Sequence, residues 1–149
     1  MNDPYNLQRF IDAQTSDYEI ALKEIRQGRK RSHWMWYIFP QILGLGHSAM
    51  AQRYAITSLD EAIAYYQHPV LGKRLIEISK ALLTLATNDA TGIFGTPDDM
   101  KLRSCMTLFI MVPNADTVFG LVLKKYFNGI KDRATLEMIS PKSNWNNRY

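Results

Sequence analysis

The sequence has few of the residues that metal and redox chemistry need. Among its 149 residues there is a single cysteine, Cys105, so the chain can form neither an internal disulfide nor a cysteine-rich zinc site. The histidines His33, His47 and His68 lack the HxxxH or HxH spacing of metal ligands. We therefore expect no metal and no cofactor, and the lone thiol is typical of a reducing compartment.

The sequence also lacks a long apolar run and a targeting segment. Its longest apolar stretches, residues 34–40 and 108–113, are far shorter than the roughly 20 residues that a membrane-spanning helix needs. Residues 1–5 show neither the basic nor the apolar region of a signal peptide. These absences predict a cytoplasmic protein with no membrane partner.

Several common catalytic motifs are missing as well. The sequence contains no GxGxxG, Walker A, HExxH, nucleophile-elbow or kinase motif. No segment alternates between apolar and polar residues, and no Asn-Gly or Asp-Gly turn occurs, which argues against strands. With 46% hydrophobic and 21% charged residues, the composition is that of a folded globular protein.

What the sequence does contain is helical periodicity. It predicts a single all-α domain of about six or seven helices over residues 1–140, followed by a frayed basic and polar tail at residues 141–149. The first helix is expected to carry Leu7, Phe10, Ile11 and Gln14 on one face. A second is expected to carry Tyr18, Ala21, Leu22 and Ile25, with Gly28 ending it. The first helix is predicted to start at Asp3-Pro4, and later helices at Ser58, Thr96-Pro97, Asp116 and Asp132, all of which offer capping residues.

An aromatic-rich segment from Ser32 to Gln41 interrupts this pattern after the second helix. It holds Trp34, Trp36, Tyr37 and Phe39, and Gly44 and Gly46 follow it. In one interpretation the rings fill the core between helices. In the other they line a pocket with His33, Gln41 and the glycine backbone, and Lys30 and Arg31 stand at its rim. The residues alone leave both interpretations open, although part of the segment is expected to form a short helix.

A second polar group lies on a later helix, where Lys101, Ser104 and Thr107 form one stripe at helical spacing. We expect a ligand pocket between the segment from Ser32 to Gln41 and the helix face from Lys101 to Thr107. The candidate ligand-binding residues are Lys30, Ser32, His33, Trp34, Trp36, Gln41, Gly44, Gly46, Lys101, Ser104 and Thr107. The alternative is a solvated stripe with an ion pair from Asp98 or Asp99 to Arg103.

For catalysis His33 is the first candidate, because imidazole exchanges protons near neutral pH. Lys101 and Ser104 are the second, since a desolvated lysine can activate a serine. Neither candidate has a partner that the sequence identifies, so whether the protein is an enzyme is left open.

The net charge of +4 leaves room for other partners. From Lys23 to Arg31 the chain holds five basic residues and only one acid, Glu24. Three hypotheses follow: a domain that binds a small anionic or nucleotide-like molecule, a helical module that docks a partner protein through its basic surface, and weak nucleic-acid binding, which we regard as the least favoured. Convergence of His33, Gln41, Lys101 and Ser104 in one cleft favours the first hypothesis, whereas side chains satisfied by backbone groups argue against it.

The chain resembles an uncharacterised bacterial family, catalogued as domain-of-unknown-function family eighteen-ten and sometimes labelled calpastatin-like. The resemblance is carried by Ser32-His33-Trp34-Met35-Trp36-Tyr37-Ile38-Phe39-Pro40-Gln41, by Gly44-Leu45-Gly46-His47-Ser48, and by shorter matches such as Arg9-Phe10, His68-Pro69, Ile93-Phe94-Gly95 and Thr107-Leu108-Phe109. It covers about residues 5–137. The family implies an all-helical fold and no established reaction. The calpastatin label carries no weight, because calpastatins are disordered and this composition is globular.

Overall fold

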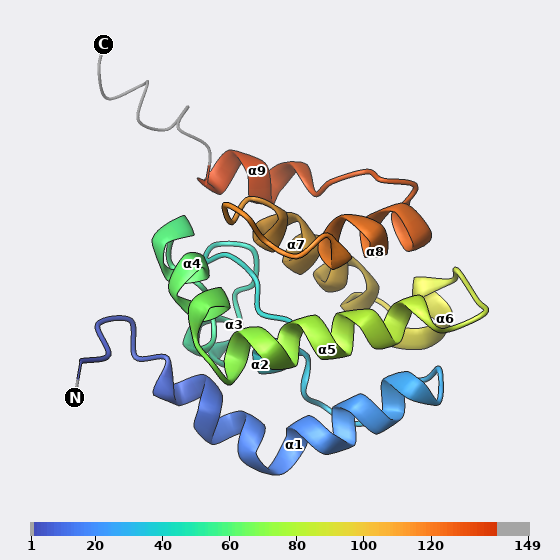
Figure 1. Cartoon of the computed structure of the whole chain (residues 1–149), viewed down its shortest axis with the longest axis horizontal. Coiled ribbons are helices and arrows are strands. Elements are labelled where there is room, and N and C mark those ends of the chain that lie inside the picture. The colour runs from blue at the N-terminus through green and yellow to red at the C-terminus, as the bar shows by residue number, and fades with distance from the viewer. Residues whose placement is uncertain (1, 140–149) are drawn as a thin grey trace.

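Helices account for nearly all the regular structure in a computed structural model of the chain, which describes residues 2–139. Within that range the helices are α1 (Gln8–Arg26), α2 (Met35–Ile38), α3 (Ala49–Arg53), α4 (Leu59–Gln67), α5 (Leu71–Leu83), α6 (Ala90–Phe94), α7 (Asp98–Ile110), α8 (Val118–Phe127) and α9 (Arg133–Ile139) (Figure 1). The predicted all-α fold is confirmed. The described helices outnumber the expected six or seven because α2, α3 and α6 have only four or five residues each, too few to show periodicity. The predicted tail at residues 141–149 lies outside the described residues.

The first two predicted helices are one continuous helix, α1. Its buried positions include Phe10, Gln14, Tyr18 and Ile25, which form an unbroken stripe through the polar residues Thr15-Ser16-Asp17. Those three polar residues lie mostly on the outer side, so they do not end the helix. The aromatic-rich segment therefore follows the first helix of the structure rather than the second.

The start of α1 also differs from the prediction. Asp3 accepts hydrogen bonds from the backbone N–H groups of Leu7 (2.8 Å) and Gln8 (3.0 Å), as a capping residue does. The helix itself begins only at Gln8, so Pro4 precedes it. A capping carboxylate can thus act across a turn that separates it from the first helical residue.

Helix α5 crosses the middle of the molecule and packs against α1 on one side and α8 on the other (Figure 1). Aromatic rings from α1, α4 and α7 pack in a row in the core. The ring centres of Phe10 and Tyr65 lie 5.0 Å apart, edge to face, and those of Tyr65 and Phe109 lie 5.4 Å apart. Such ring pairs contribute about 0.5–1.5 kcal/mol each beyond the area they bury.

The loop after α2 is fixed by one strand-like contact. Ile42 and Ile56 form an isolated parallel bridge, in which the backbone N–H groups of Leu43 and Ile56 donate to the carbonyls of Ile56 (2.7 Å) and Gln41 (2.8 Å). This bridge is the nearest approach to a sheet within residues 2–139. It holds the aromatic segment in place against the chain that leads into α4.

Three predicted caps are confirmed. Ser58 accepts from the Glu61 N–H (3.1 Å) at the start of α4, Asp116 from the Val118 N–H (2.8 Å) before α8, and Asp132 from the Thr135 N–H (3.0 Å) at α9. At Thr96-Pro97 the helix begins one residue later, at Asp98, without a side-chain cap. Over residues 2–139 no helix is both long and apolar enough to cross a membrane.

Candidate functional site

The aromatic segment is anchored by a buried carboxylate at the end of α1. Glu24, which is 7% exposed, accepts four hydrogen bonds: from the backbone N–H groups of Arg31 (2.8 Å) and Ser32 (3.0 Å), from the Ser32 hydroxyl (2.6 Å) and from the Trp34 indole N–H (2.9 Å). Burial raises the pKa of this carboxyl group, but the hydrogen bonds outweigh it and lower the pKa to about 2. Glu24 is therefore ionised at neutral pH and shapes the turn that follows α1.

A chain of charges then connects this turn to α7. The Lys30 ammonium lies 3.0 Å from Asp98 Oδ2, donates to the Ser32 carbonyl (2.6 Å) and sits 5.1 Å from the centre of the Trp34 ring. Its backbone N–H donates to the carbonyl of Ile93 (2.8 Å). With its side chain only 8% exposed, Lys30 links two parts of the fold and does not stand at an open rim.

Trp36 and Lys101 meet at the outer end of this chain. Of the four aromatic side chains in residues 32–41, Trp34, Tyr37 and Phe39 are buried and Trp36 is partly exposed. The Lys101 ammonium lies 5.6 Å from the centre of the Trp36 ring and 3.6 Å from Asp98 Oδ1. Asp98 is thus shared by two lysines, and its contact with Lys101 is the longer one.

The other two members of the predicted stripe face away from solvent. Ser104 and Thr107 are buried, and each donates its hydroxyl to a carbonyl of its own helix, that of Met100 (3.2 Å) and that of Arg103 (2.8 Å). Both also contact Asp132, which caps α9: the Ser104 hydroxyl donates to its carboxylate (3.2 Å), and the Thr107 oxygen accepts from its N–H (2.9 Å). Helix α9 therefore docks on these hydroxyls.

His33 and Gln41, two other predicted site residues, each contribute a backbone carbonyl to the hydrogen bonds of this region. His33 is exposed, and its backbone carbonyl accepts from the Tyr37 hydroxyl (3.3 Å). Gln41 is half-buried, and its carbonyl belongs to the Ile42–Ile56 bridge. The structure brings Trp36 and Lys101 together. The expected convergence of His33, Gln41, Lys101 and Ser104 in one cleft is not seen among the contacts of residues 2–139, since the Ser104 hydroxyl is bonded to Met100 and Asp132 and the Gln41 carbonyl belongs to the bridge. A ligand surface in this region therefore depends on Trp36 and Lys101 alone.

Backbone conformation and packing explain the two glycines after the segment. Gly44 has φ +105°, a conformation that side chains disfavour, and an added Cβ would lie 2.8 Å from the end of Met138. At Gly46 an added Cβ would lie 2.6 Å from the Cβ of Ala51 on α3. Gly44 is therefore required by its backbone conformation, since the flexible end of Met138 can move, whereas Gly46 is required by the close approach of Ala51.

The side chains of the basic run from Lys23 to Arg31 do not all face solvent. Glu24 and Lys30 turn inward, whereas Lys23, Arg26, Arg29 and Arg31 remain exposed. The predicted ion pair from Asp98 or Asp99 to Arg103 is absent from the ion pairs described: Asp98 pairs with the two lysines, and Arg103 lies 3.8 Å from Asp132. In the part of the chain that the structure describes, no three His, Cys, Asp or Glu side chains are grouped closely enough to hold a metal.

Three acids that organise the site, Glu24, Asp98 and Asp132, were not predicted as such from the sequence. For Glu24 a signal existed, since an acid three residues after Ala21 and next to Ile25 lies along the apolar stripe of α1. Asp98 and Asp132 looked like ordinary helix starts. Their long-range partners, Lys30 and Ser104, could not be inferred from local spacing.

Comparisons with known proteins identify the family but no activity. The chain belongs to the family described as "Protein of unknown function (DUF1810)", whose pattern matches residues 4–139. It is similar to a solved structure from Mycobacterium tuberculosis, the conserved hypothetical protein Rv1873, with 46% identity and a TM-score of 0.90 over 93% of this chain and 99% of the other. No curated protein matches the chain.

Proposed function

We propose that this member of the family binds a small anionic molecule that carries a flat ring, at the surface made by Trp36 and Lys101. The observation that carries the proposal is the pairing of a partly exposed indole with a lysine ammonium 5.6 Å from its centre. A ring of the ligand would stack on Trp36, and its carboxylate or phosphate would meet Lys101.

The exposure of Trp36 supports the stacking half of the proposal. Its neighbours Trp34 and Phe39 are almost completely buried and contribute to the core. Part of the Trp36 ring is exposed to water instead. A ligand ring that covered it would remove this apolar surface from water, which is favourable. Stacking of a base on an aromatic side chain contributes about 1–3 kcal/mol in proteins that bind single-stranded nucleic acids.

The charge around Asp98 supports the anionic half. Lys30 and Lys101 share this one carboxylate, so the three side chains carry a net charge of +1. Asp98 lies closer to Lys30 (3.0 Å) than to Lys101 (3.6 Å), so an anion can reach Lys101 while the inner pair persists. The Lys101 side chain is 23% exposed and thus accessible to a ligand.

A catalytic role is a further step within this proposal, and His33 is the residue that we propose for it. It is exposed and lies three residues before Trp36. If the bound molecule is turned over, replacing His33 with alanine should abolish turnover and retain binding.

A thermal-shift screen tests the binding proposal. Mononucleotides, aromatic carboxylates and phosphorylated aromatic metabolites are added separately to the wild-type chain and to Trp36→Ala and Lys101→Ala variants. Lys131→Ala is the matched control, since Lys131 is exposed and has no described contact with Trp36. A ligand present at about 100 times its Kd stabilises the native state by about 2.7 kcal/mol.

We expect at least one compound to raise the Tm of the wild type and of Lys131→Ala, and to have little effect on the two site variants. A panel without any stabilising compound contradicts the proposal. So does a compound that stabilises all four proteins equally, because it would bind elsewhere.

A further inference from the structure

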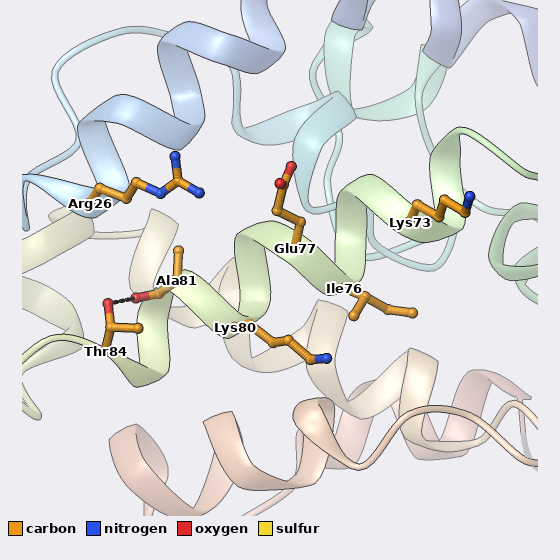
Figure 2. A pocket seen from close by; sticks show the side chains of 7 residues that line it. All are labelled: Arg26, Lys73, Ile76, Glu77, Lys80, Ala81 and Thr84. Atoms are coloured by element: carbon orange, nitrogen blue, oxygen red, sulfur yellow. Dashed lines mark hydrogen bonds between the residues drawn. The ribbon is translucent and has the colours of Figure 1, made fainter.

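A groove of about 420 Å³ lies along α5 beside the end of α1 (Figure 2). Its lining includes Arg26 from the end of α1 and Lys73, Ile76, Glu77, Lys80 and Ala81 from α5. It shares no residue with the surface made by Trp36 and Lys101. We refer to it as the α1–α5 groove.

The rim of the α1–α5 groove is basic. Arg26, Lys73 and Lys80 contribute three positive charges against the single carboxylate of Glu77. Glu77 already accepts a hydrogen bond from the Tyr18 hydroxyl, which holds it toward α1. The Lys80 ammonium has one long contact, 3.8 Å from Asp116, and its side chain is 61% exposed. These cations are therefore available to an acidic partner.

The floor of the groove is apolar. Ile76 is half-buried and Ala81 is buried, and both lie between the cationic side chains. Lys73, Ile76 and Lys80 stand at positions i, i+3 and i+7 of α5, so they follow one stripe of the helix surface. An apolar floor between cations complements a helix that has an apolar stripe flanked by acids.

From this combination we propose that the α1–α5 groove docks an acidic amphipathic helix of a partner protein. A nucleic acid fits the same surface less well. Single strands bind by stacking their bases on aromatic side chains, and the residues described along this groove include none. The floor instead offers aliphatic contact, which a phosphate backbone does not use.

The test uses the full chain and a designed probe, a fluorescein-labelled peptide of about 18 residues with leucines on one helical face and glutamates beside them. Fluorescence anisotropy should show saturable binding that weakens as salt is raised, because screening reduces attraction between exposed charges. Arg26→Glu/Lys73→Glu should weaken it at least about tenfold, and Ile76→Ser should weaken it at both low and high salt.

Two controls make the result specific. Lys124→Glu/Lys131→Glu changes the net charge equally at exposed positions outside the lining, and it should bind the peptide nearly as well as the wild type. Trp36→Ala should also bind normally, which separates this groove from the proposed ligand site. Circular dichroism confirms that each variant is folded.

Three results would overturn the proposal. The first is the absence of saturable binding to the wild type. The second is equal binding of a peptide with the same composition in scrambled order, because the attraction would then be charge alone. The third is tighter binding of single-stranded DNA that Arg26→Glu/Lys73→Glu abolishes, which would make the surface a nucleic-acid site.

Discussion

The carboxylate of Glu24 gathers four donors from the ten residues that follow it, and its burial would be costly without them. Its bonds to Ser32 and Trp34 fix where the aromatic segment begins. Trp36, two residues after Trp34, then emerges partly at the surface. A single acid on α1 thus holds Trp34, the first aromatic residue of the segment, in place.

Replacing Glu24 with glutamine should lower the free energy of unfolding by about 2–3 kcal/mol, because the amide removes the charge and turns one acceptor into a donor that faces other donors. Urea unfolding at neutral pH measures the change. Glu19→Gln, an exposed position on the same helix, is the control and should change stability by less than about 0.5 kcal/mol. Equal effects of the two substitutions would contradict the role assigned to Glu24.

The lowered pKa of Glu24 also predicts a dependence on pH. Since the folded pKa is about 2 and the ordinary value is 4.5, the ionised carboxylate stabilises the native state fully above pH 4.5. That contribution, about 3 kcal/mol, is lost as the pH falls from 4.5 toward 2. Unfolding measured across this window should show a steeper loss for the wild type than for Glu24→Gln. Parallel curves would contradict the assignment.

Residues 32–41 stand out in the sequence, whereas Glu24 looks like one acid in a basic cluster. Its burial depends on the turn after α1, which brings Arg31, Ser32 and Trp34 back over the helix end. The helical periodicity of α1 gives no information about the turn that follows the helix. The nearest sequence signal was the position of an acid along an apolar stripe.

At the scale of helices, α7 makes two kinds of contact along its length. Its first turn carries Asp98 and Lys101, which join the aromatic segment, and its middle carries Ser104 and Thr107, which receive α9. In the sequence Lys101, Ser104 and Thr107 look alike as one polar stripe. The hydroxyl pair is covered because the N-terminus of α9, with Asp132, lies over it.

Replacing Asp132 with alanine should loosen α9. The carboxylate accepts from the Thr135 N–H (3.0 Å), the Thr135 hydroxyl (2.6 Å) and the Ser104 hydroxyl (3.2 Å), so its loss should cost about 1–2 kcal/mol. Hydrogen exchange should accelerate in residues 133–139 more than in α5. Glu137→Ala removes only an exposed pair with Arg133 and should have little effect. Unchanged exchange in α9 of the Asp132 variant would contradict this account.

The helix starts that could be predicted from the sequence are those set by short-range capping bonds. Ser58, Asp116 and Asp132 cap helices through bonds to residues two or three positions ahead, and such spacing is visible in a sequence. The expected division into two helices between Gln14 and Tyr18 was wrong, because polar residues on the outer face of a helix do not interrupt it. Helices of four or five residues, such as α2, exist only through packing.

At the scale of the whole molecule, the ion pairs from Lys30 through Asp98 to Lys101 join the end of α1 and the aromatic segment to α7. The proximity of the aromatic segment to Lys101 could be proposed from the sequence. The role of Asp98 as the shared carboxylate could not, since it depends on tertiary contacts. Lys30, expected at an open rim, is instead enclosed by Asp98, Trp34 and the Ser32 carbonyl.

The most direct measurement of the proposed ligand site is a ¹H–¹⁵N NMR titration that follows the indole N–H groups, assigned with Trp34→Phe and Trp36→Phe variants. Each compound that stabilises the wild-type chain is titrated into labelled protein. We predict that the Trp36 indole signal shifts in a saturable way, while that of Trp34, whose N–H is held by Glu24 (2.9 Å), stays nearly fixed. A stabilising compound that leaves the Trp36 signal unmoved at saturation would contradict the account.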